Sequence, residues 1–152
     1  MRKFLAIILA CFMMISLVAC TTDGGSLSQF STKVGGEKYT IKIADQQGYS
    51  ISSSETEEGR FVIYKSGKAI IEHGLITSGL ETSMAKELIN REDSEYTTTK
   101  DKATFYAFEQ YDTETQTYTI LIKYPDKPSF AMFTMEGSMD DVKALFDVMS
   151  VK

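Results

Sequence analysis

The sequence predicts an α+β domain in which a largely antiparallel sheet carries two helices, one packed on each face as an α/β/α sandwich. Short segments of alternating apolar and polar residues recur along the chain between turn residues, as is typical of strands joined by hairpins. Two segments instead repeat apolar residues at helical spacing, one near the middle and one at the end. The order strands, helix, strands, helix belongs to the α+β class.

The first 20 residues have the features of a lipoprotein signal peptide. Arg2 and Lys3 precede an uncharged apolar run over residues 4–18, which is the length of a secretory core and short for a membrane span. We therefore expect removal of residues 1–19 and acylation, for example by palmitate, of the next residue. An ordinary signal peptide and an uncleaved anchor helix are the alternatives. The expected cleavage box is Leu17, Val18, Ala19 and Cys20.

Acylation of Cys20 would hold the chain at a membrane, because a diacylglyceryl group contributes on the order of 20 kcal/mol at ~0.8 kcal/mol per buried CH₂. The expected location is extracytoplasmic, at the outer face of the cytoplasmic membrane in the cell envelope. Membrane lipid is thus the first expected partner. No disulfide or cysteine metal site is expected, since Cys11 leaves with the signal peptide.

Cleavage would leave 133 residues with 14 basic and 21 acidic side chains, a net charge of −7. A chain of this length forms one domain with a hydrophobic core. The acidic balance argues against nucleic acid and anionic headgroups as partners. Residues 20–38, with two Gly-Gly pairs and many Ser and Thr, are expected to form a flexible tether. The single α+β domain is expected over residues 39–152.

The strands of this domain are expected where β-branched and aromatic residues alternate with polar ones. Ser66-Gly67 is a two-residue turn signal within a hairpin. The expected strands are residues 39–43, 49–53, 61–65, 68–72 with a continuation at 75–77, 95–99, 104–111, 117–124 and 129–136.

The first helix is expected to begin after Ser78, because Glu81 follows three residues later and completes an S-x-x-E capping box. The segment over residues 90–93 ends it. Its expected apolar stripe is Leu80, Met84, Ala85, Leu88 and Ile89.

The closing helix is expected to begin at Ser138 as the N-cap, with Asp140 and Asp141 in the positive first turn. Its expected buried face is Met139, Val142, Leu145, Phe146 and Met149.

The two loops at residues 111–117 and 124–129 suggest a hypothesis for the register of the three strands that they connect. Pairing Tyr111 with Thr117 places Phe108 opposite Ile120, and pairing Tyr124 with Ser129 places Ile120 opposite Phe133. The resulting core face is Tyr106, Phe108, Tyr118, Ile120, Ile122, Phe133 and Met135.

The reverse face of these strands is also too apolar for a solvated surface. We expect it to be covered by a helix or to form a partly open groove, and it is the candidate ligand or partner face. A one-residue slip in either loop would exchange the faces. This reverse face also carries Ala107, and its candidate site residues are Phe105, Leu121, Phe130 and Met132.

These features together resemble the PsbP-like α/β/α sandwich superfamily over residues 39–152. The resemblance rests on Gly48-Tyr49 after the opening strand, the hairpin through Lys65-Ser66-Gly67-Lys68, the helix over residues 80–90, the meander over 104–136 and Leu145-Phe146 in the last helix. The chain lacks the apolar residue–Pro turn usual before Gly48. The resemblance implies a non-catalytic accessory or docking protein, with no site residues to transfer.

Few residues could support catalysis or metal binding. His73 is the sole imidazole, and no second His or Cys stands at a metal-ligand spacing. The acidic clusters around residues 55–58, 92–95 and 112–114 lack the order of a calcium loop, and no serine lies in a nucleophile motif. We expect no cofactor, no metal and no enzymatic activity.

The sequence therefore favours a lipid-anchored, non-catalytic accessory or protein-interaction module with a protein partner in the cell envelope. The alternative is a small-molecule or glycan-binding lipoprotein that uses an aromatic-bearing sheet face.

Overall fold

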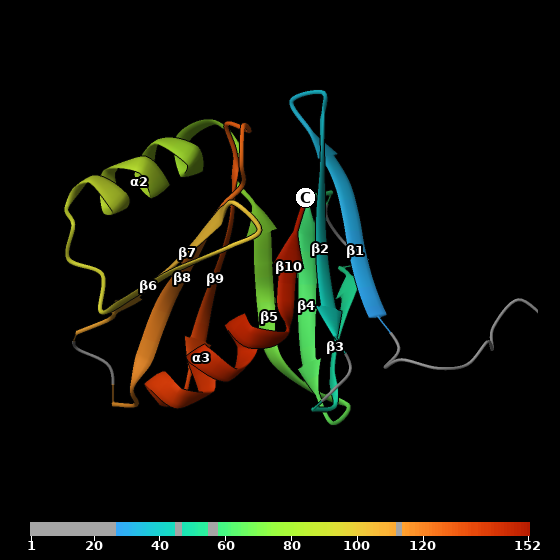
Figure 1. The fold of residues 1–152 in the computed structure, drawn as a ribbon, viewed down its shortest axis with the longest axis vertical. Coiled ribbons are helices and arrows are strands. Elements are labelled where there is room, and N and C mark those ends of the chain that lie inside the picture. The colour runs from blue at the N-terminus through green and yellow to red at the C-terminus, as the bar shows by residue number, and fades with distance from the viewer. Residues whose placement is uncertain (1–26, 45–46, 55–57, 112–113) are drawn as a thin grey trace, which may run out of the picture.

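A computed structural model of the chain describes residues 27–44, 47–54, 58–111 and 114–152. It contains a small sheet in the order β1-β2-β10 and a large sheet in the order β3-β4-β5-β9-β8-β7-β6, with antiparallel pairing throughout (Figure 1). In chain order the elements are β1 (Leu27–Val34), β2 (Glu37–Ala44), β3 (Tyr49–Ser53), β4 (Arg60–Lys65), β5 (Lys68–Ile76), α2 (Gly79–Asn90), β6 (Tyr96–Lys100), β7 (Ala103–Glu109), β8 (Thr117–Lys123), β9 (Phe130–Glu136), α3 (Met139–Val148) and β10 (Met149–Val151).

The large sheet is covered on both faces, because successive residues of its central strands enter two different hydrophobic clusters. Ile120 and Ile122 belong to the main core, whereas Leu121 between them belongs to a smaller cluster under α2. This arrangement confirms the predicted α+β class with one helix on each face.

The main core lies between the large sheet, the small sheet and α3. Phe146 of α3 packs against Phe105 with ring centroids 5.2 Å apart, and Tyr39 of β2 is fully buried. The predicted N-cap of α3 at Ser138 is confirmed, and it is part of a capping box that was not predicted: Ser138 Oγ accepts from the Asp141 N–H and the Asp141 carboxylate accepts from the Ser138 N–H. No helix within the described ranges is long and apolar enough to cross a membrane.

Helix α2 is less firmly seated than α3. Ala85 is its one fully buried residue, while Leu88 and Ile89 are half-buried over Phe108 of the sheet. The predicted capping box is wrong here: Ser78 occupies the N-cap position, but its side chain makes no cap hydrogen bond. Thr82 Oγ1 instead donates to Oγ1 of Thr77, the residue before the N-cap, at 3.0 Å.

The register prediction is confirmed for one strand pair and wrong for the other. Ile120 pairs with Phe133 between β8 and β9, as predicted. Between β7 and β8, Ala107 rather than Phe108 pairs with Ile120. This one-residue slip reverses β7, so Phe105 and Ala107 face the main core while Tyr106 and Phe108 face α2.

The expected tether is wrong for residues 27–38. Leu27–Val34 forms β1, which pairs with β2 along its whole length, and Phe30 is buried against Phe61 with ring centroids 5.3 Å apart. The turn at Gly35-Gly36 closes a hairpin within the fold. Residues 1–26 lie outside the described residues, so the signal peptide, its cleavage box and Cys20 remain sequence predictions.

Candidate functional site

Strands β5 and β9 are neighbours in the large sheet but separate along most of their length. Their ladder pairs are limited to Leu75 with Met132 and Ile76 with Ala131. Figure 1 shows the two strands meeting near one end and spreading apart toward the other. Beyond these two pairs, a gap in the sheet separates the facing edges of β5 and β9.

A kink in β5 explains this separation. The β4–β5 register shifts twice between Phe61 and Tyr64, and Phe61 lies opposite Gly74. Such bulges bend a strand and increase its twist. Gly74 permits the close approach, because an added Cβ would lie 2.2 Å from Phe61 Cε2. The bend carries the earlier part of β5 away from β9.

An apolar hollow of about 490 Å³ lies between α2 and the strands β5, β9 and β8. Its aliphatic and thioether wall comprises Leu75, Met84, Leu88 and Met132, and Met84 is 58% exposed. Leu80, one turn earlier on α2, is 74% exposed. Four of the five residues in the predicted apolar stripe, all except Ala85, are therefore only partly covered or open to solvent, and α2 covers a groove without sealing the sheet.

A second hollow of about 260 Å³ continues the groove along the gap. It shares His73 and Thr134 with the first hollow and is otherwise lined by residues at the facing edges of β5 and β9, including Glu72 and Glu136. Glu72, Thr134 and Glu136 are exposed. The groove therefore combines apolar walls under α2 with carboxylates at its open end. We call the two hollows together the α2 groove.

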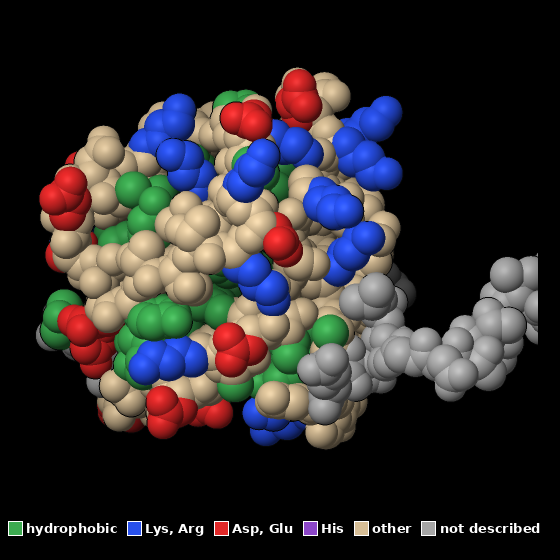
Figure 2. Space-filling model, in the orientation of Figure 1, with side chains coloured by type: hydrophobic (Ala, Val, Ile, Leu, Met, Phe, Trp, Pro, Cys, Tyr) green, Lys and Arg blue, Asp and Glu red, His purple; other side chains and the backbone are tan. Residues whose placement is uncertain are grey.

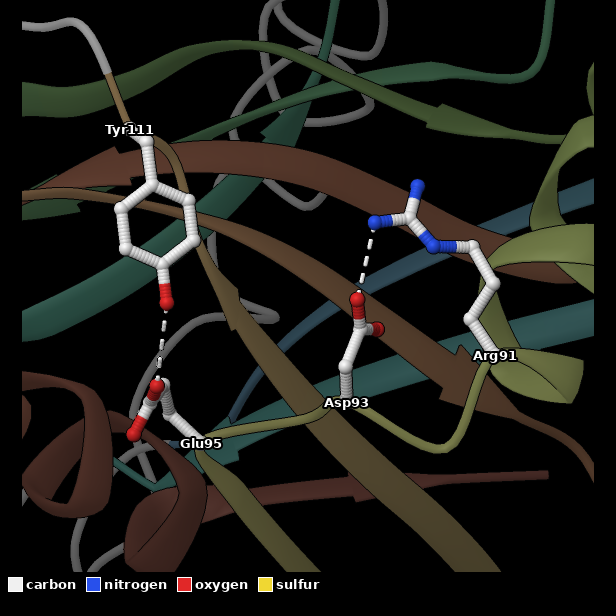
Figure 3. A network of polar contacts seen from close by, with 4 residues as sticks. All are labelled: Arg91, Asp93, Glu95 and Tyr111. Carbon is white, nitrogen blue, oxygen red and sulfur yellow. Dashed lines mark hydrogen bonds and ion pairs between the residues drawn. The ribbon is translucent and has the colours of Figure 1, made fainter.

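Exposed polar contacts lie at and beyond the C-terminal end of α2, where Arg91 borders the α2 groove (Figure 3). Arg91 lines the first hollow, and its Nη2 lies 2.8 Å from Asp93 Oδ2 in an exposed ion pair. Nearby, Tyr111 Oη, which follows β7, donates to Glu95 Oε1 at 3.4 Å. The Glu95 carboxylate raises the pKa of Tyr111 above its ordinary value, with smaller contributions from desolvation and Glu109.

The structure places the four sequence-predicted site residues on two faces. Phe105 is buried in the main core against α3, so its assignment to the partner face is wrong, because the β7 register differs by one residue from the predicted one. Leu121 and Phe130 are buried beneath α2, and Met132 lines the α2 groove. Reasoning from the sequence missed Leu75 and Met84 as groove residues, although the wide apolar stripe of α2 was a signal.

His73 lies within β5 rather than at a strand end, and it lines both hollows. A catalytic imidazole needs a neighbour that orients it or a nucleophile that it activates. Within the described part of the chain, no hydrogen bond or ion pair of the His73 imidazole is found. The same ranges contain no group of three or more His, Cys, Asp or Glu side chains that could hold a metal ion.

Comparison with known proteins adds one structural similarity. The sequence matches no protein family profile and no curated protein. The chain is similar to the solution structure of cyanobacterial PsbP (CyanoP) from Synechocystis sp. PCC 6803, with a TM-score of 0.42 and 16% sequence identity. The similarity covers 90% of this chain and 99% of the cyanobacterial one.

Proposed function

We propose that this chain is a lipid-anchored, extracytoplasmic accessory module that binds an extended segment of a protein partner in the α2 groove. The observation that carries the proposal is the apolar hollow under α2 joined to the gap between β5 and β9. Extended peptides bind in this way when their main chain meets a strand edge and alternate side chains enter pockets.

The charges around the groove define the chemistry of this partner. Glu72 and Glu136 line its open end and Glu87 lines the hollow, whereas Arg91 is already paired with Asp93. A segment with alternating apolar residues and a Lys or Arg near the open end therefore complements the groove. Met84 and Met132 suit such a site, because thioether side chains adapt to varied apolar shapes.

The anchoring part of the proposal rests on the cleavage box that ends at Cys20. Replacing Cys20 with Ser is expected to move the protein from the membrane fraction to soluble or unprocessed fractions. A Cys20→Ser protein that stays firmly membrane-bound would contradict the lipid anchor. The result does not depend on the α2 groove, so the two parts are tested separately.

The binding part is tested with a displayed library of random decapeptides as the probe. Recovered peptides are expected to alternate apolar residues and to carry a basic residue. Thr134→Trp fills the groove at an exposed strand position and is expected to abolish recovery, whereas Thr99→Trp on edge strand β6 is the matched control. Recovery that survives Thr134→Trp, or no enrichment at all, would contradict the proposal.

A small-molecule ligand is the second candidate, because a hollow of about 490 Å³ falls within the usual range of ligand pockets, roughly 300–1,000 Å³. A glycan fits this hollow poorly, since sugars stack on exposed aromatic rings. Phe133 is the one Phe, Tyr or Trp among the described lining residues, and its ring is buried in the main core and so is not available to a sugar. A thermal-shift screen with small apolar acids and amines would detect such a ligand.

A further inference from the structure

The outer face of the small sheet carries a cluster of lysines on a chain that is acidic overall. Outward positions alternate with the buried Phe30, Tyr39 and Ile41 along β1 and β2. Figure 2 shows Lys and Arg side chains gathered over the part of the molecule where β1 and β2 lie. We call this surface the lysine face; it comprises Lys33, Lys38, Lys42 and Lys152, with Lys127 from the β8–β9 turn beside them.

Strand pairing brings these lysines close together. Lys33 and Lys38 are direct cross-strand partners, and Lys42 lies four residues, about 13 Å, further along β2. Lys152 pairs with Thr40 through two backbone hydrogen bonds of 2.9 and 3.0 Å. A shallow hollow of about 370 Å³ opens among Lys38, Lys42, Lys127 and Lys152.

This arrangement opposes stability of the fold. Like charges directly opposite one another in a sheet are destabilising, and Lys33 faces Lys38 in this way. Among the described residues no ion pair within 4.0 Å joins a lysine of this face to a carboxylate. Among the described residues, the nearby negative charges are Glu37 at the β1–β2 turn, Glu58 beside Lys33 and Lys38, and Asp126 next to Lys127.

One lysine of the face is held in place by aromatic rings. The Lys127 ammonium lies 5.0 Å from the ring centroid of Tyr39 and 5.7 Å from that of Tyr124, and it donates a hydrogen bond to the Lys38 carbonyl. This contact ties the β8–β9 turn to β2 and keeps a fifth positive charge beside the other four.

The lysine face lies on the sheet that the anchored end of the chain enters first. Six residues separate Cys20 from Leu27, the first residue of β1, and such a segment spans at most about 25 Å whatever its conformation. A domain of this size has a radius of gyration of about 14 Å. A lipid on Cys20 therefore keeps the small sheet within contact distance of the bilayer.

We propose that the lysine face docks on anionic phospholipid headgroups of the membrane to which Cys20 is anchored. The position of the lysine face next to the membrane rests on the proposed lipid anchor, whereas its affinity for anionic headgroups does not. The net charge of −7 argued against such a partner, but charge segregation overrides the net value at short range, because salt screens charges beyond about 8 Å at physiological ionic strength.

Docking in this way would leave the α2 groove accessible. The small sheet and α2 cover opposite faces of the large sheet, since they contribute to the two separate clusters. With the lysine face on the bilayer, the α2 groove opens away from it toward a partner.

The test measures binding of the unlipidated chain 21–152, which retains every described element, to sedimented vesicles. Vesicles with about 30% phosphatidylglycerol in phosphatidylcholine are compared with pure phosphatidylcholine. Each lysine removed is expected to weaken binding about fivefold, the equivalent of about 1 kcal/mol per basic residue near an anionic surface. The triple variant of Lys33, Lys38 and Lys42 to Gln should therefore bind about 100-fold more weakly.

The control triple variant changes the exposed Lys86, Lys102 and Lys123 to Gln, with the same loss of charge. It should bind within about twofold of the unchanged chain, and Lys38→Glu should weaken binding while melting no lower than the unchanged chain. Equal binding to both vesicle types, equal losses in the two triple variants, or binding to soluble polyphosphate but not to vesicles would overturn the proposal. None of these outcomes bears on acylation of Cys20, which the fractionation experiment tests.

Discussion

The ring of Phe61 lies directly over Gly74 on the neighbouring strand, where an added Cβ would come within 2.2 to 2.5 Å of three ring carbons. The same ring packs edge-on against Phe133 with centroids 6.0 Å apart, so the pair joins β4, β5 and β9 at the head of the gap. The separation of β5 from β9, and with it the α2 groove, depends on this contact.

Gly74→Ala is expected to lower the free energy of unfolding by about 1–3 kcal/mol, the usual cost of overpacking a tight core. Phe61→Leu in the same chain should recover part of this loss, because a smaller side chain makes room for the methyl group. Urea unfolding of the two single variants and the double variant measures the coupling. Strictly additive losses would show that the ring does not exclude a side chain at position 74.

Three buried tyrosines should respond differently to loss of the hydroxyl. The hydroxyls of Tyr49 and Tyr124 have no hydrogen-bond partner among the described residues, and burial raises the pKa of Tyr124 far above its ordinary value. Tyr39 Oη instead accepts from the Ser129 N–H at 3.3 Å. Replacing either unpartnered tyrosine with Phe should leave stability unchanged or raised, whereas Tyr39→Phe should cost about 1–2 kcal/mol. Thermal melts that rank the variants in the opposite order would contradict this.

The capping box of α3 should make stability depend on acid. The hydrogen bonds from the Ser138 hydroxyl and backbone N–H lower the pKa of Asp141 below its ordinary value. A carboxyl whose pKa is lower in the folded state stabilises the protein fully above its unfolded pKa, about 3.9, and loses that contribution as the pH falls through the folded pKa.

Asp141→Asn should therefore be less stable than the unchanged chain near pH 7, and the difference should shrink between about pH 5 and pH 2. Ser138→Ala should cost about 1 kcal/mol near pH 7 as a lost N-cap. Asp140→Asn, in the same helical turn but outside the capping box, is the matched control. A difference for Asp141→Asn that does not change with pH would contradict the role of the charged carboxylate.

The lysine face makes a prediction about stability as well as binding. Lys38→Glu converts the cross-strand contact with Lys33 into an opposite-charge pair and should raise the free energy of unfolding by about 0.2–1 kcal/mol at low salt. The gain should fade as salt is added, because the pair is exposed. A variant less stable than the unchanged chain at low salt would show that the two ammonium groups do not repel one another.

Strand register could be predicted only where the residue pattern and the turn allowed a single pairing. The β8–β9 register was predictable because both strands are strongly apolar and Pro125 and Pro128 limit the turn between them. The β7–β8 register was not, since both faces of β7 are apolar: Phe105 with Ala107 on one side, Tyr106 with Phe108 on the other. Hydrophobic burial therefore did not distinguish two registers one residue apart.

The ends of the fold were missed for a related reason. Among the inward-facing residues of β1, only Phe30 and Val34 are apolar. The Gly-Gly pairs on either side of β1 are typical of a linker. In β10 three residues continue directly from α3, and Met149 fits a helical stripe as well as a strand. Both strands are stabilised by pairing with β2, a long-range contact that local patterns do not encode.

The candidate site was only partly predictable. An apolar reverse face and a helix over it were expected, and Met132 was assigned to it. The groove itself depends on two tertiary features. One is the kink of β5 at Gly74, and the other is the position of α2, which buries Ala85 against the sheet but leaves Leu80 and Met84 exposed. The lysines of β1 and β2 were visible in the sequence, but they gather only once the hairpin forms.

Both proposals place the domain at a membrane through one modified residue, so the intact mass of the processed protein isolated from membranes is the most direct measurement. The account predicts an amino-terminal Cys20 whose mass exceeds that of the bare chain 20–152 by a diacylglyceryl group. A free thiol on Cys20, or a chain that begins at another residue, would contradict it.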